Sequence, residues 1–132
     1  MSTVSAMFDT HPDAGGVDKQ KFIAAIEACL ECLESCTLCA DACLAEDSVA
    51  ELRECIRTDL ACADVCTATA ALLSRPGTPT EILRAQLEAC RVTCAACAAE
   101  CESHADHHEH CRVCAEACRR CEQACAALLE VL

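Results

Sequence analysis

Large aromatic side chains are almost absent from this chain. Its 132 residues include no Trp, no Tyr and only two Phe, fewer than an ordinary core of this size would carry. Gly and Pro are also scarce, with three of each, and they are confined to the amino-terminal segment and one turn. Because the helix-favouring residues Ala, Leu and Glu dominate the rest, the composition predicts an all-α fold.

Positive charge is scarce as well. The formal net charge is −12, and no basic patch of the kind that binds nucleic acid is present. An acidic surface of this kind is usually only solvated, although it also attracts cations weakly. The first residues lack the basic segment and apolar run of an export signal, and no segment is apolar enough to span a membrane. We therefore expect a cytoplasmic protein, without nucleic-acid or membrane partners, whose thiols stay reduced.

Cysteine is the residue that the chain has in excess. There are 17 cysteines, and an odd number cannot all pair in internal disulfides. Five of them follow one another at alternating steps of three and four: Cys111, Cys114, Cys118, Cys121 and Cys125. Residues at these steps share one face of an α-helix, so the five thiols form a row roughly 21 Å long. Five cysteines between residues 29 and 43 repeat the pattern, and shorter rows lie within residues 55–66 and 90–101.

Four helices are predicted, over residues 18–45, 48–74, 78–103 and 106–132. Ser48 and Thr78 begin capping boxes, Pro79 suits the first helical position, and Asp106 resembles a third cap. Because the connections are short, neighbouring helices should be antiparallel, which gives an up-down-up-down four-helix bundle. Residues 1–17 are expected to be a flexible arm, in which a segment around Met7 and Phe8 could dock on the bundle or on a neighbouring subunit.

This topology makes the two ends of the bundle different. The turns that follow the first and third helices lie at one end, together with Cys43, Cys55, Cys101, Cys111 and a group of histidines. We expect this polar end to be the entrance to the core, and we call it the mouth. The other end should be closed by apolar side chains, namely Phe22, Ile26, Leu72, Leu73, Leu83, Leu87, Leu128 and Leu129.

Rows of facing thiols predict a metal site, because cysteine in these positions gives up the burial that leucine would provide. Soft thiolates favour Cu(I), with zinc and iron–sulfur clusters as competitors. Zinc needs a closed tetrahedron of four ligands, which continuous helices present poorly. Iron–sulfur cysteines usually lie in loops, and no cysteine here is followed by Pro. Bridging thiolates would allow about one Cu(I) per cysteine, or about 17 ions.

Polar residues extend the rows of thiols. Continuing the third helix past Cys101, or the fourth helix back from Cys111, reaches His104, His107 and His108, which are therefore candidate ligands at the mouth. His110 lies off the row and is not expected to bind metal.

Asp59 interrupts the row of thiols on the second helix, where its side chain should face the core. It either pairs with a basic side chain or leans to solvent, or it serves as an oxygen ligand.

The repeated Cys-x2-Cys-x3-Cys pattern makes residues 18–132 resemble the cytosolic branch of the bacterial copper storage proteins. The resemblance implies a cysteine-lined four-helix bundle that stores many Cu(I) ions without catalysis, often as a homotetramer, with a copper chaperone as a conceivable partner. Asp59 and Thr69 are departures from the family pattern, since a fuller row would hold cysteine at these positions.

The alternative functions are an iron–sulfur or redox electron carrier and a zinc buffer. The predicted metal ligands are Cys29, Cys32, Cys36, Cys39, Cys43, Cys55, Cys62, Cys66, Cys90, Cys94, Cys97, Cys101, Cys111, Cys114, Cys118, Cys121, Cys125, His104, His107, His108 and Asp59.

Overall fold

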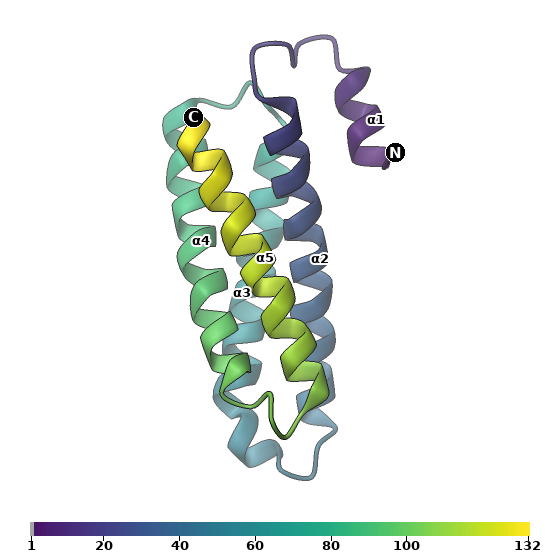
Figure 1. Cartoon of the computed structure of the whole chain (residues 1–132), viewed down its shortest axis with the longest axis vertical. Coiled ribbons are helices and arrows are strands. Elements are labelled where there is room, and N and C mark those ends of the chain that lie inside the picture. The colour runs from purple at the N-terminus through teal and green to yellow at the C-terminus, as the bar shows by residue number, and fades with distance from the viewer. Residues whose placement is uncertain (1) are drawn as a thin grey trace.

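Four long helices form an antiparallel bundle (Figure 1). The computed structural model describes residues 2–132, and the long helices are α2 (Lys19–Leu44), α3 (Arg53–Leu73), α4 (Thr80–Glu102) and α5 (Glu109–Val131). The chain reverses direction after each helix, which confirms the predicted up-down-up-down all-α fold. The packed pairs are α2–α3, α3–α4, α4–α5 and α5–α2, so α2 faces α4, and α3 faces α5, across the bundle axis.

The start of α2 is confirmed, whereas other helix starts shift by a few residues. Asp18 has an extended backbone, and its Oδ1 accepts a hydrogen bond from the Lys21 N–H at 3.2 Å. The cap predicted at Ser48 does not form, because its backbone (φ −85°, ψ 24°) is not extended. Instead Val49–Leu52 form the short 3-10 helix η1 before α3 begins. Pro79 precedes the first residue of α4 rather than occupying that position.

The cap predicted at Asp106 is also wrong. The backbone N–H groups of His107 and His108 donate to the His104 carbonyl at 3.1 and 3.0 Å, which folds this segment into tight turns. Asp106 lies within these turns and cannot adopt the extended backbone of a cap. His108 is the extended residue that precedes α5. The histidine segment is therefore a compact connection at the mouth.

The amino-terminal segment contains a helix, α1 (Thr3–Asp9), where an arm was expected. Ser2 caps it by accepting a hydrogen bond from the Ser5 N–H at 3.1 Å. Phe8 is only 5% exposed, and its ring centroid lies 6.2 Å from that of Phe22 in α2. The docking suggested for this segment is thus confirmed for Phe8, while Met7 remains exposed. The division into an arm and a bundle domain at residue 18 stays a prediction.

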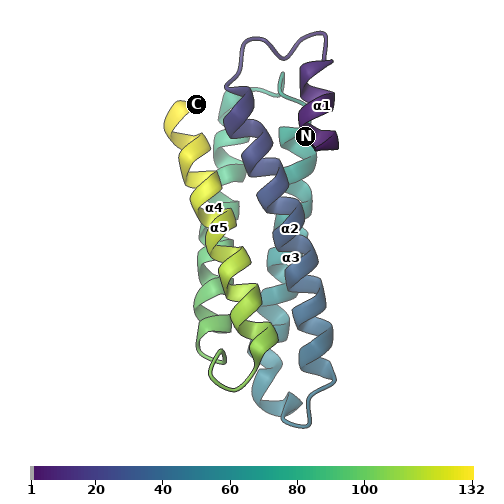
Figure 2. The same cartoon turned by 45° about the vertical axis from the view of Figure 1, so that its right-hand side comes forward.

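Helix α1 lies beside one end of the bundle (Figure 2). Apolar side chains close this end, as predicted. The buried members of this plug are Phe22, Ile26, Leu73, Leu83, Leu87 and Leu128, while Leu72 and Leu129 are partly buried. The connections α2–η1 and α4–α5 lie together at the opposite end. None of the described helices combines the length and the apolarity that a membrane span needs.

Candidate metal centre

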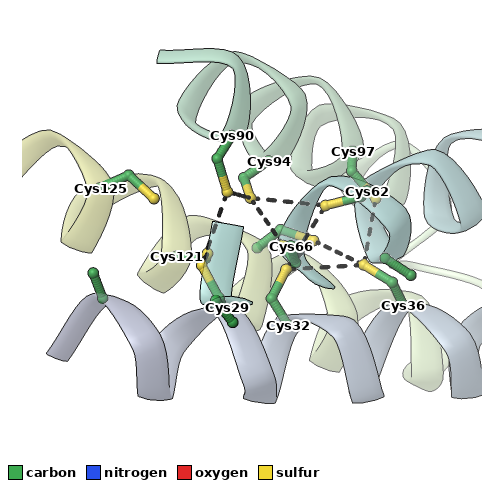
Figure 3. Close-up of a cluster of buried hydrophobic side chains, with 14 of the residues drawn as sticks. Cys29, Cys32, Cys36, Cys62, Cys66, Cys90, Cys94, Cys97, Cys121 and Cys125 are labelled. Atoms are coloured by element: carbon green, nitrogen blue, oxygen red, sulfur yellow. Dashed lines mark hydrogen bonds between the residues drawn. The ribbon is translucent and has the colours of Figure 1, made fainter. Parts of the chain in front are cut away.

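All 17 thiols lie in the core, as the spacing predicted, and all are free. No cysteine is more than 2% exposed. Sulfur atoms on neighbouring helices are in contact, with Sγ–Sγ distances of 3.8 Å for Cys32 and Cys62 and 3.7 Å for Cys62 and Cys94 (Figure 3). The cysteine row on each helix therefore faces the cysteine rows of the neighbouring helices, as the helix periodicity predicted.

Sulfur atoms also meet across the diagonal of the bundle. Cys29 in α2 lies 3.9 Å from Cys90 in α4, and Cys36 lies 3.9 Å from Cys97, measured between Sγ atoms. A thiol ends at its γ atom, so these contacts require the four helices to approach the axis closely. The result is a continuous column of sulfur.

The thiols gather in groups of four, in each of which the Sγ atoms lie within 4.8 Å of one another. These groups include Cys29–Cys90–Cys121–Cys125, Cys32–Cys66–Cys94–Cys121, Cys32–Cys36–Cys62–Cys118, Cys36–Cys97–Cys114–Cys118 and Cys39–Cys43–Cys55–Cys111. Cys32, Cys36, Cys118 and Cys121 each belong to two of these groups. Shared ligands suit ions that are bridged by thiolates.

Charge favours copper over zinc in such groups. Four sulfurs this close could also hold a zinc ion, which prefers four tetrahedral ligands. A zinc ion with four thiolates, however, keeps a net charge of about −2, which is costly to bury. One Cu(I) per bridging thiolate leaves no net charge. A column in which neighbouring groups share thiols therefore suits many Cu(I) ions.

Asp59 faces the sulfur column, as its position in the row predicted. Its side chain is fully buried. The thiol of Cys97 donates to Oδ1 at 3.2 Å, those of Cys101 and Cys114 donate at 3.5 Å, and Cys55 lies 3.9 Å from Oδ2. The suggested pairing with a basic side chain or solvent is wrong, because thiols from three helices surround the carboxyl group.

The surroundings of Asp59 keep it protonated. Burial, together with the nearby thiols of Cys114 and Cys97, raises the pKa of Asp59 from 3.8 to about 12. Thr69, the other departure from the row, is also buried. Its hydroxyl donates to the Val65 carbonyl at 2.8 Å and accepts from Gln86 Nε2 at 3.0 Å. Thr69 thus anchors α4 to α3 where a thiol would otherwise stand.

The group nearest the mouth consists of Cys39, Cys43, Cys55 and Cys111, which we call the mouth group. His110 Nδ1 lies 3.5 Å from the Sγ of Cys39 and 3.6 Å from that of Cys111. The expectation that His110 points away from the thiols is therefore wrong. Burial raises the pKa of the Cys43 and Cys111 thiols, so these two are protonated in the metal-free protein.

The other mouth histidines contact carboxylates. His104 Nε2 lies 2.7 Å from Glu100, and His108 Nδ1 lies 2.9 Å from Glu46. His107 is exposed. Among residues 2–132, the hydrogen bonds between a histidine and a thiol all involve His110.

Sequence reasoning missed His110 and Glu46. An ideal helix places residue 110 beside the row, but His110 lies in the first turn of α5, where its ring reaches across to Cys39 of α2. Glu46 follows α2 and contacts histidines more than 60 residues away. No local sequence pattern signals such a contact. The sequence indicated this region only through the prediction that the connections after the first and third long helices lie together at the mouth.

A surface groove between α2 and α5 reaches the column near the mouth. Its lining includes His110, Cys39 and Cys114, with the exposed apolar side chains of Leu38 and Val113 beside them. Cys39 and Cys114 are 2% and 1% exposed, whereas Cys43, Cys55 and Cys111 at the end of the bundle are completely covered. Cys39 and Cys114, which line this groove, are therefore the cysteines near the mouth that keep a trace of exposed surface.

Comparison with known proteins places these features in a family. The family model described as copper storage protein matches residues 18–130. The copper storage protein Ccsp of Streptomyces lividans, loaded with 10 copper equivalents, is 59% identical, with a TM-score of 0.96 over 98% of this chain and 100% of that one. A structure of a cytosolic copper storage protein from the same organism, with five coppers, is 61% identical, with a TM-score of 0.86 over 89% and 99% of the two chains. Metal-free copper storage protein 3 of Bacillus subtilis is 33% identical, with a TM-score of 0.69 over 80% and 96%. No curated protein matches the sequence.

Proposed function

This chain belongs to the copper storage protein family, and we propose that it holds many Cu(I) ions on the thiolates of its core, as a reversible store in the cytosol. The observation that supports this most directly is the column of 17 buried, free thiols, most of which gather in groups of four. Each bound Cu(I) replaces a thiol proton, so the core fills without accumulating buried charge. All 17 cysteines are proposed ligands, with a capacity of up to about one ion per thiolate.

We propose further that copper enters at the mouth through His110. Its Nδ1 already lies within 3.6 Å of two thiols of the mouth group, and imidazole nitrogen is a copper ligand. His104, His107 and His108 remain proposed ligands of the entry region, with less support from geometry. Asp59 offers oxygen next to the mouth group and the next group inward, so we propose that it is a polar step between them.

An anaerobic Cu(I) titration of the fully reduced protein against a chromogenic chelator tests the storage function. The protein should withhold copper from the chelator until about one equivalent per cysteine has been added. Saturation at one or two equivalents would instead indicate a chaperone or a regulatory site. In the same assay, His110→Ala should slow loading more than His104→Ala does and leave the capacity nearly unchanged. Equal loading rates for the wild type and His110→Ala would refute the role of His110.

Two finer statements accompany this function. We propose that the protein is not an enzyme, since no set of nucleophile, base and acid stands outside the thiols. We also propose a homotetramer, which exposed apolar side chains such as Leu38, Leu60 and Val92 support. Light scattering at several concentrations tests the assembly. A monomer at micromolar concentration would contradict it.

A further inference from the structure

A single carboxylate joins the two connections at the mouth. Glu46 Oε2 lies 2.9 Å from His108 Nδ1 and 2.9 Å from His110 Nε2. Glu46 follows α2, while both histidines belong to the α4–α5 connection and the first turn of α5. The side chains are 35%, 16% and 27% exposed, respectively, so solvent covers only part of the cluster. The three groups form one hydrogen-bonded unit across the mouth.

The direction of these hydrogen bonds determines where each imidazole carries its proton. An ionised carboxylate only accepts hydrogen bonds, so each nitrogen that faces Glu46 must donate. His110 therefore carries its proton on Nε2, and the neutral ring has an unprotonated Nδ1. That nitrogen is the one that lies 3.5 and 3.6 Å from the sulfurs of Cys39 and Cys111. His108 has the opposite arrangement, with its proton on Nδ1.

We propose that Glu46 is a positioning residue for copper entry: it holds the proton of His110 on Nε2 and so presents the Nδ1 lone pair to Cu(I) beside the mouth group. This inference rests on the proposed role of His110. Carboxylates commonly fix the tautomer and the ring orientation of metal-binding histidines in this way. Without the carboxylate, part of the His110 population carries its proton on Nδ1, where it blocks the metal.

The position of the cluster explains why such control matters. The thiols of Cys43, Cys55 and Cys111 have no exposed surface, whereas His110 is half-buried and contacts both the carboxylate outside and the thiols inside. An incoming ion therefore meets the imidazole before it meets three of the four thiols of the mouth group. The tautomer of this ring then limits how often an encounter leads to binding.

Glu46→Gln tests the proposal, because Gln keeps the size of the side chain but can donate as well as accept. Asp47→Asn is the matched control, since it removes the same charge from the exposed position next to Glu46. At pH 8 and without copper, long-range 1H–15N spectra should show His110 with its proton on Nε2 in the wild type and a mixture of tautomers in Glu46→Gln. Loading from a Cu(I) chelator should be roughly tenfold slower in Glu46→Gln, with unchanged capacity, and unaffected in Asp47→Asn.

Three results would overturn the proposal. The first is a wild-type His110 with its proton on Nδ1. The second is wild-type loading by Glu46→Gln when His110→Ala is slow, which would leave the proposed function standing. The third is slow loading by Glu46→Gln with an unchanged tautomer, because the loss of negative charge would then explain the effect. In the double variant, Glu46→Gln should add no further slowing to His110→Ala. Wild-type loading by His110→Ala would instead refute the entry role on which this inference rests.

Discussion

Replacing Asp59 by Asn should stabilise the metal-free protein at neutral pH. Asn keeps the size of the side chain and an oxygen that can accept from the surrounding thiols, but it has no acidic proton. The pKa of Asp59 rises from 3.8 in the unfolded chain to about 12 in the folded protein. The folded state therefore keeps a proton that the unfolded state releases. Across this interval the stability of the wild type falls as the pH rises, by about 1.4 kcal/mol per pH unit.

The structure sets an upper limit to this effect. Between 3.8 and neutral pH lie about three pH units, so the buried carboxyl group destabilises the fold by up to about 4 kcal/mol at pH 7. The Asp59→Asn variant escapes this penalty. Its advantage over the wild type should vanish near the pKa of an ordinary carboxyl group and grow steadily toward neutrality. A domain is typically stable by only about 5–15 kcal/mol, so the difference is measurable.

Urea denaturation of the reduced, metal-free protein, followed by circular dichroism from pH 5 to pH 8, measures this difference. Other titrating groups affect both proteins alike and cancel in the comparison. Asp64→Asn is the matched control, because it removes the same charge from an exposed position on the same helix, and its stability relative to the wild type should not vary with pH. A constant difference between Asp59→Asn and the wild type would refute the inference that the buried carboxyl group holds a proton.

Three other perturbations have expected outcomes. Loading with Cu(I) should raise the melting temperature steeply, because ions that bind only the folded state stabilise it, and equal melting temperatures would contradict storage in the core. Phe8→Ala should destabilise the protein by about 3 kcal/mol in urea, since it removes the ring packed on Phe22, whereas exposed Met7 should tolerate Ala. Asp59→Cys should keep or raise the copper capacity in a chelator titration, and a lower capacity would show that the oxygen itself is required.

The bundle and its sulfur column could be predicted because both follow from local periodicity. Alternating steps of three and four from Cys111 to Cys125 fix one helix face. When four helices joined by short connections each carry such a face, the four faces can all be buried only in the interior of one bundle. The same periodicity placed Asp59 in the core, although its surroundings of thiols from α3, α4 and α5 depend on the way the helices pack.

The mouth could not be predicted in the same way. Ser48 and Asp106 have the residue types of helix caps, but local backbone hydrogen bonds fold these connections into tight turns and shift the helix starts. The pairing of Glu46 with His108 and His110 joins segments more than 60 residues apart, and no spacing in the sequence encodes it. Helix α1 was missed for a similar reason, because it is stabilised by the burial of Phe8 against Phe22 more than by its own seven residues.

The apolar plug has a consequence for the order in which the store is used. Phe22, Leu87 and Leu128 fill the core beyond the group that contains Cys125, and α1 packs beside α2 at this end. If copper enters and leaves at the mouth, as proposed, we expect the ions to exchange in sequence along the column. Copper deposited last would be returned first, and the deepest ions would be released only after the outer groups have emptied. The protein would then hold a readily exchanged pool and a slow one, separated by depth rather than by differences between ligands.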